Sequence, residues 1–273
     1  MLEGYKYPKI WSFSNLQMWN NCPLCWKLKY LDQKASKDGN AFSQYGSFVH
    51  GLLEQYEKGE LPLIALAEEY DDGFDDNVTK PWPMFPIGLG ERYYQDGKQY
   101  LENFTGFGDQ YEIIGVEDEF VTEIAGYKLI GYVDLILRDK NTGEITIVDH
   151  KSKSVKRLQQ DWDELVLQLY IYAHYVHEKY GEWPKFLVFN CFREAQMVGE
   201  EFNPEEYERM VKWVETTITE ILNATEFPDK IAKDANERIA KGKRPLKDNT
   251  YFCKTLCDCW DACPIWQTED LRM

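Results

Sequence analysis

The pattern of apolar and polar residues predicts a chain in which strands and helices are interspersed. From Tyr127 to Leu137 and from Glu144 to Lys153 the residues are largely apolar and β-branched, and the turn-forming segment 138–143 separates the two runs. A β-hairpin is therefore expected. Further strands are predicted at 111–122 and 186–192. Helices are predicted at 16–31 with Ser14 as the N-cap, 46–58, 90–104, 160–180 and 203–224.

These elements predict an α/β fold in which helices flank a central mixed sheet. A chain of 273 residues that is 44% hydrophobic can bury a large core, so one elaborated domain over residues 1–273 is expected. The insert at 59–89 is interpreted as a mobile cover or a partner surface because it is acidic and contains Pro81, Pro83 and Pro86. The expected parts are N-terminal helices at 11–58, the insert and a helix at 59–104, an α/β core at 111–224, and a basic linker with a cysteine-rich tail at 225–273.

The predicted hairpin places candidate chemistry on one surface. If strand pairing centres near Asn141 and Thr142, Asp134 and Asp149 lie opposite one another, with Cβ atoms about 5 Å apart. Side chains two residues apart share a face of a strand, so Lys151 joins Asp149 while His150 faces away. Two such carboxylates would repel unless Mg²⁺ or Mn²⁺ neutralised them, which suggests metal-dependent cleavage of a phosphodiester. Taken alone, the same residues also fit a surface hairpin with ordinary salt bridges.

Residues on two predicted helices extend this surface. His50 lies on the helix 46–58, and a neutral imidazole is a plausible further ligand for Mn²⁺, although a structural histidine is the alternative. On the helix 160–180, Gln168 and Tyr172 are four residues apart and share a face. An amide and a phenol beside a metal site can bind phosphate oxygens, whereas the alternative is a helix edge with a tyrosine in the core.

Taken in order along the chain, these residues resemble a known family. The motifs are Gly46-x-x-x-His50, Gly131-x-x-Asp134, Asp149-x-Lys151 and Gln168-x-x-x-Tyr172. From about Ser12 to Pro264 they resemble the PD-(D/E)XK nuclease superfamily, specifically its RecB-like branch, which includes CRISPR-associated and phage recombination exonucleases. The resemblance implies a restriction-endonuclease-like sheet carrying a nuclease site.

The same resemblance implies roles for individual residues. His50, Asp134, Asp149 and the backbone carbonyl of His150 would bind the metal. Lys151 would orient water and stabilise the transition state, and Gln168 with Tyr172 would position the strand. Glu119, on the preceding predicted strand, is a further candidate that would act through water.

The cysteines give a second metal-binding signal. Cys253, Cys257, Cys259 and Cys263 lie within eleven residues, with Cys22 and Cys25 near the other end of the sequence. The resemblance implies a [4Fe-4S] cluster held by Cys22, Cys253, Cys257 and Cys263. Cys259 is an alternative to Cys257, Cys25 is surplus, and the three residues between Cys253 and Cys257 depart from the two that are usual in the family. A zinc site is the chemical alternative, and Cys191 is interpreted as a core thiol.

Charge and composition restrict the partners. A net charge of −16 argues against broad electrostatic binding of duplex DNA, although the acids concentrate at 68–76. Local basic clusters at 151–157 and 230–247 could line a path for a threaded strand end. No apolar run is long enough to span a bilayer, and the N-terminal segment lacks the apolar core of a signal peptide. We therefore expect a cytoplasmic protein of a microbial cell or phage-infected host.

Two functions follow from the sequence. The preferred hypothesis is a Mg²⁺- or Mn²⁺-dependent DNA exonuclease that acts on single strands or exposed ends in recombination, repair or phage DNA processing. Because no helicase motif occurs, unwinding would require a helicase or recombination partner. The alternative is a non-catalytic nucleic-acid-binding or assembly module that retains the fold and the iron–sulfur staple. An endonuclease or an RNA-directed enzyme would use the same metal chemistry.

Overall fold

The computed structural model describes residues 5–35, 39–231, 233, 240, 252–259 and 261–264. Contacts divide the chain into two compact units: one holds the described parts of 1–40, 123–129 and 211–273, and the other holds 41–122 and 130–210. The residues predicted for phosphodiester chemistry all belong to the second unit, and every cysteine except Cys191 belongs to the first. The single elaborated domain expected from the sequence stays a prediction.

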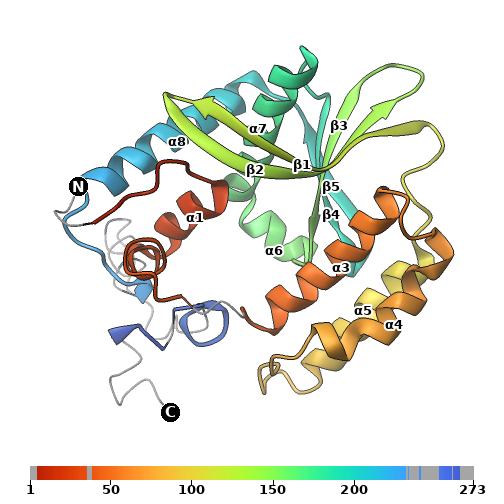
Figure 1. Cartoon of the computed structure of the whole chain (residues 1–273), viewed down its shortest axis with the longest axis horizontal. Helices are drawn as coiled ribbons and strands as arrows, with labels where there is room; N and C mark the ends of the chain where they lie inside the picture. Colours follow the sequence, from red (N-terminus) through yellow and green to blue (C-terminus); the bar gives the residue numbers. More distant parts are fainter. Residues whose placement is uncertain are drawn as a thin grey trace. The chain divides into compact units, whose positions relative to one another are not determined.

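A five-stranded mixed sheet forms the centre of the second unit, in the order β1-β2-β3-β4-β5 (Figure 1). The strands are β1 (Tyr111–Ile124), β2 (Tyr127–Asp139), β3 (Ile145–Lys151), β4 (Phe186–Cys191) and β5 (Gln196–Glu201). Residues 123–129, at the tips of β1 and β2, are counted with the first unit. β2 and β3 pair antiparallel, β3 and β4 parallel, and β4 and β5 antiparallel. The predicted α/β fold with a mixed central sheet is therefore confirmed.

The helices of the second unit fall into two groups: one long helix packs against the sheet, and three others pack against one another. The parallel pairing of β3 with β4 requires a crossover, which α6 (Val155–Gln160) and α7 (Trp162–Tyr180) supply. α7 packs against both strands. α3 (Ala41–Glu57), α4 (Leu66–Asn77) and α5 (Leu89–Asn103) lie side by side (Figure 1). A Cβ at Gly97 of α5 would lie 2.5 Å from the Tyr70 hydroxyl, so glycine permits the close approach of α4 and α5.

The acidic insert is more ordered than the sequence suggests. Residues 66–77 form α4, where Leu66 and Tyr70 are fully buried in the apolar core of this layer. The acidic side chains occupy the rest of the helix surface. This part of the insert is therefore a packed helix with an exposed acidic face, and its role as a mobile cover or a partner surface stays a prediction.

The first unit begins with a broken helix rather than the single helix predicted at 16–31. α1 (Phe13–Asn21) is followed by α2 (Pro23–Trp26) and by the π-helical turn η1 (Lys27–Leu31). The N-cap is Ser12, whose hydroxyl accepts the backbone N–H of Asn15 at 3.2 Å, so the assignment of Ser14 as the cap is wrong. Pro23 lacks an N–H and begins the second helix. Trp26 is fully buried, and its indole N–H donates to the Asn15 side chain at 2.9 Å.

The remaining elements are one long helix and short helical turns. α8 (Pro204–Asn223) buries Met210, Val214, Ile218 and Ile221 at helical spacing, as the sequence predicts. The short turns are η2 (Leu63–Ala65), η3 (Phe192–Glu194) and η4 (Phe252–Leu256). Within the described residues, no helix combines the length and apolar composition needed to cross a membrane. Much of the predicted basic stretch, including Arg238, Lys241, Lys243, Arg244 and Lys247, lies outside the described residues.

Candidate active site

The two predicted aspartates lie across the hairpin from one another. Leu135 pairs with Val148 in the antiparallel ladder, and continuing this register by one step places Asp134 opposite Asp149. The predicted register of the hairpin is thereby confirmed. The side chain of Asp149 is buried, and burial together with the charge of Asp134 raises its pKa to about 6. Burial also opposes ionisation of Asp134, but the hydrogen bond and charge of His50 lower its pKa overall. The two carboxyl groups therefore differ in acidity.

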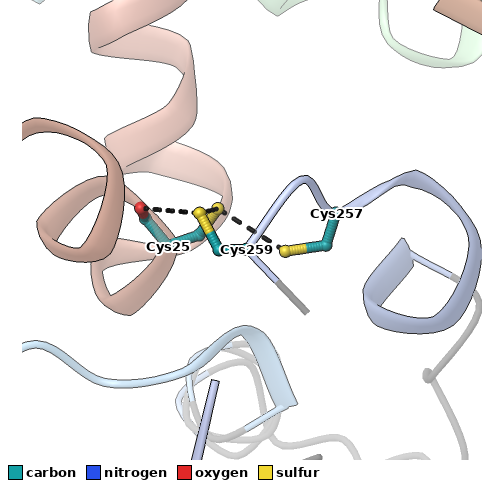
Figure 2. A group of neighbouring side chains, drawn as sticks. All are labelled: Cys25, Cys257 and Cys259. Atoms are coloured by element: carbon teal, nitrogen blue, oxygen red, sulfur yellow. Dashed lines mark hydrogen bonds between the residues drawn. The ribbon is translucent and has the colours of Figure 1, made fainter. Parts of the chain in front are cut away.

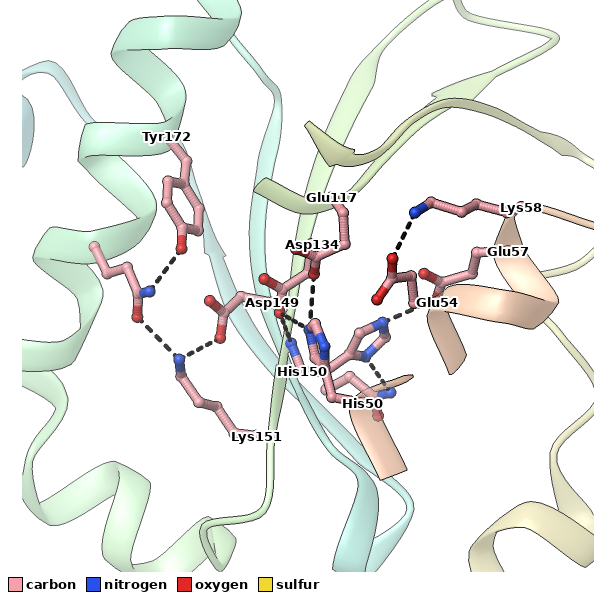
Figure 3. A network of polar contacts seen from close by, with 12 residues as sticks. His50, Glu54, Glu57, Lys58, Glu117, Asp134, Asp149, His150, Lys151 and Tyr172 are labelled. Atoms are coloured by element: carbon pink, nitrogen blue, oxygen red, sulfur yellow. Dashed lines mark hydrogen bonds and ion pairs between the residues drawn. The ribbon is translucent and has the colours of Figure 1, made fainter. Parts of the chain in front are cut away.

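Three candidate metal ligands from separate elements, His50, Glu117 and Asp134, lie close together (Figure 3). The His50 Nε2 atom, from α3, lies 3.0 Å from Oδ2 of Asp134 and 3.2 Å from Oε1 of Glu117 on β1. Burial lowers the pKa of His50, yet the bond to Asp134 and the charges of Asp134, Glu117 and Asp149 raise it to about 9. One donor atom from each of His50, Glu117 and Asp134 falls within 4.8 Å of the others. An imidazole and two carboxylates in this arrangement suit a divalent cation.

Glu117 is the candidate ligand that the sequence did not reveal. Glu119, considered from the sequence, is exposed, whereas Glu117 is partly buried beside His50. Glu117 has a backbone φ of +46°, in the left-handed region. A residue in this conformation within a strand interrupts the two-residue alternation, so counting along β1 does not identify its face. Such strained residues persist where the surroundings hold them, and they cluster at active sites.

A chain of polar contacts extends from Asp149 to α7. The ammonium of Lys151 lies 2.6 Å from Oδ2 of Asp149 and donates to the Gln168 carbonyl oxygen at 2.9 Å. The Gln168 amide in turn donates to the Tyr172 hydroxyl at 2.6 Å (Figure 3). Burial and the charges of Asp149 and Asp134 raise the pKa of Tyr172 well above its ordinary value. Tyr172 thus stays a neutral phenol, and its hydroxyl hydrogen can donate to a bound oxygen.

A cleft opens beside these residues. It has a volume of about 290 Å³ and lies between α3 and the end of β3. Its lining includes Gly46, Ser47, His50, Gly51, Lys151 and Ser152. A Cβ on Gly46 would lie 3.2 Å from the Ser152 hydroxyl, so a larger residue there would narrow the cleft. His50 and Lys151 both line this space, which a substrate could enter.

The cysteines of the first unit gather at a second site. Cys25 Sγ lies 3.6 Å from Cys257 Sγ and 3.4 Å from Cys259 Sγ (Figure 2). Hydrogen bonds from Cys25 and Cys257 lower the pKa of Cys259, which favours the thiolate form that binds metals. The sequence analysis treated Cys25 as surplus and Cys259 as an alternative to Cys257. Both thiols are close to the predicted ligand Cys257.

The other predicted ligands lie around this group. Cys22 accepts the backbone N–H of Cys25 at 3.3 Å, and Cys22 and Cys263 share an apolar cluster with Cys25 and Cys259. The thiol of Cys253 is close enough to Cys22, Cys257 and Cys263 for their charges to affect its pKa, which burial raises to about 12. Neither these cysteines nor the buried Cys191 on β4 form a disulfide within the described residues. Soft thiolate donors in this number suit zinc or an iron–sulfur cluster.

Comparison with known proteins assigns the family. The model of the PD-(D/E)XK nuclease superfamily matches residues 10–264, and the chain belongs to this superfamily. No curated protein matches the chain. Among the solved structures, one named "Crystal structure of SSO0001" has 17% sequence identity and a TM-score of 0.39. The match covers 96% of this chain and 89% of that chain. Membership in the superfamily implies metal-dependent nuclease activity on a nucleic acid.

Proposed function

We propose that this protein is a Mg²⁺- or Mn²⁺-dependent DNA exonuclease of the RecB-like branch, acting on single-stranded DNA or exposed DNA ends in recombination, repair or phage DNA processing. The observation that carries the proposal is the convergence of His50, Glu117 and Asp134 within 4.8 Å, beside Asp149 and Lys151. A helicase or recombination protein would supply separated strands. The acidic composition, with its net charge of −16, favours a strand end held in a local cleft over wide contact with duplex.

The donor atoms fit the metal that the superfamily uses. His50, Glu117, Asp134 and Asp149 would hold it, with the backbone carbonyl of His150 completing the set. When bound, the cation would polarise the phosphoryl group and lower the pKa of a bound water.

The protein side chains contribute positioning and charge. The ammonium of Lys151 is held between Asp149 and Gln168, so it can hold an attacking water and stabilise charge on the phosphate. Tyr172 retains its proton and can donate to a phosphate oxygen. Gln168 orients both Lys151 and Tyr172 through its amide. This arrangement gives Lys151 one preferred position before substrate binds, which favours catalysis by preorganisation.

A comparison of linear and circular substrates tests this proposal. End-labelled linear single strands, blunt duplex and closed circular single strands would each be incubated with protein and Mn²⁺, Mg²⁺ or EDTA. The proposal predicts that short products are released from linear strands only when the metal is present. The closed circles should stay intact. Cleavage of the circles would indicate an endonuclease. Binding of the linear strand without cleavage would favour the non-catalytic module.

For the thiol site we propose a structural [4Fe-4S] cluster held by Cys22, Cys253, Cys257 and Cys263, with zinc as the alternative. Four thiolates suffice for either group. Binding would tie the segment at Cys22 to the tail at Cys263 and would stabilise the first unit. Protein purified without oxygen should contain iron and acid-labile sulfide in equal amounts and absorb visible light, whereas zinc would give a colourless protein. Neither metal in stoichiometric amount would contradict the proposal.

A further inference from the structure

A buried polar network lies behind the candidate active site, on the other side of β3. The His150 Nε2 atom lies 2.8 Å from Oε1 of Glu57, and both side chains are only 1% exposed. The His150 Nδ1 atom lies 2.9 Å from the amide nitrogen of Asn190 on β4, which also donates to the Tyr100 hydroxyl at 2.7 Å. Figure 3 shows the His150 ring directed toward Glu57 on α3. The ring is therefore fixed at both nitrogens.

The hydrogen-bond partners define the tautomer of His150. The amide nitrogen of Asn190 can only donate, so Nδ1 of His150 is the acceptor and Nε2 carries the hydrogen. That hydrogen is donated to the Glu57 carboxyl oxygen. Buried polar pairs of this kind are weak contributors to stability compared with well-packed apolar residues, because desolvation opposes their formation. Their advantage is that the hydrogen bond is directional and fixes one relative position of the two elements.

The two elements joined by this bond both carry candidate metal ligands. Glu57 lies seven residues after His50 on α3, which is two helical turns along the same face. His150 lies between Asp149 and Lys151, and its backbone N–H donates to Oδ2 of Asp134 at 2.7 Å. α3 is thus attached to the hairpin at two points: His50 contacts Asp134, and Glu57 contacts His150.

We propose that Glu57 is a positioning residue of the metal centre. Through His150 it holds α3 and the peptide between Asp149 and Lys151 in register, so that the nitrogen of His50 and the carboxylate of Asp134 meet at one cation. This inference rests on the proposed function, because it assumes that these residues bind the metal. Glu57 itself is on the far side of His150 and contributes no ligand. Outer partners that orient metal ligands typically change metal affinity by about 10- to 100-fold when they are replaced.

Metal affinity separates positioning from a general structural role. Binding of Mn²⁺ to the full chain would be measured by calorimetry or by the electron paramagnetic resonance signal of free Mn²⁺, without DNA. Glu57→Leu should raise the dissociation constant about 10- to 100-fold. Glu57→Gln keeps a carbonyl oxygen that accepts from His150, so it should bind within about threefold of wild type. Rescue by the glutamine is the signature of the hydrogen bond.

Two further variants separate an effect on Mn²⁺ affinity from an effect on protein stability. Tyr170→Phe removes a buried hydroxyl that donates to Glu200 and lies on α7 outside this network, and it should lower thermal stability without changing Mn²⁺ affinity. The double variant Glu57→Leu with His150→Phe replaces both polar partners by apolar groups, which can restore stability. Its Mn²⁺ affinity should stay low because the directional bond is absent. Wild-type affinity in the folded Glu57→Leu or double variant would overturn the inference.

The same measurements distinguish failure of this inference from failure of the proposed function. If wild-type protein binds Mn²⁺ but does not cleave DNA, the nuclease proposal fails, while the effect of Glu57 on affinity is still measured. If wild-type protein cleaves DNA and Glu57→Leu matches it in both Mn²⁺ affinity and metal dependence of cleavage, the positioning role fails alone. If the wild type binds no Mn²⁺, both fail.

Discussion

Replacing Asp149 with asparagine should stabilise the metal-free protein while it abolishes activity. Burial and the charge of Asp134 raise the pKa of Asp149 from 3.8 to about 6, with the nearby Lys151 ammonium already opposing this shift. The folded state therefore binds the proton more tightly than the unfolded chain. The contribution of Asp149 to stability then falls as the pH rises from about 4 to about 6 and is constant above that range. A difference of about two pH units corresponds to about 3 kcal/mol, so the ionised carboxylate destabilises the fold by that order at pH 7.

The neutral amide of Asp149→Asn removes this penalty. The free energy of unfolding in EDTA at pH 7 should rise by up to about 3 kcal/mol, and the gain should shrink toward pH 4, where the wild-type carboxyl is protonated. Urea unfolding at pH 7 and pH 4.5 measures both values. A matched control is Asp139→Asn at the exposed turn, where the carboxylate accepts the N–H groups of Asn141 and Thr142 and should give no gain. A less stable Asp149→Asn protein at pH 7, or a gain independent of pH, would refute the reasoning.

Three further predictions concern the metal centre and Lys151. Lys151→Met should lower the rate of DNA cleavage by about 10²- to 10³-fold, measured in single turnover, because it removes a charge placed to stabilise the transition state; an unchanged rate would exclude that role. Glu117→Gln should raise the Mn²⁺ dissociation constant at least about tenfold, while Glu119→Gln on the exposed face should leave it unchanged. Because the pKa of His50 is raised to about 9, its imidazole carries a second proton at neutral pH, and this proton must leave before a metal binds. Mn²⁺ affinity should therefore increase about tenfold per pH unit between pH 6.5 and 8.5, and calorimetry should detect proton release.

The hairpin and its two aspartates could be predicted because local sequence determines them. The turn at 138–143 fixes the register, and the register sets Asp134 against Asp149. The approach of His50 to Asp134 across 84 residues is a tertiary contact that spacing alone does not determine. The role of His50 as a ligand beside Asp134 was predicted from the family resemblance instead. The alternation of side chains along a strand also placed His150 correctly on the face away from Asp149 and Lys151.

Other features depended on contacts or backbone conformations that leave weak signals in sequence. Glu117 was missed because its left-handed conformation interrupts the alternation in β1. β5 was missed because its residues are mostly half-exposed or exposed and include a glycine, so it lacks the apolar pattern of a buried strand. The bond between Glu57 and His150 joins residues 93 apart in the chain, and each would pass for an ordinary polar residue.

The packing of the thiols shows the same limit. Density along the sequence indicated a metal site near Cys257, but spacing could not show that Cys25 and Cys259 are its close neighbours. These distances arise from the folding of a chain segment more than 230 residues away. Sequence identified the residue types that bind metal, and the structure identified which of them meet.

The most direct test of the central claim is the cleavage of end-labelled single-stranded DNA by wild-type protein and by Asp149→Asn, each with Mn²⁺ and with EDTA. The account predicts that the wild-type protein releases labelled products only with Mn²⁺ and that the folded, more stable variant releases none under either condition. Cleavage in EDTA, or equal cleavage by the two proteins, would contradict the assignment of this site as the metal-dependent nuclease centre.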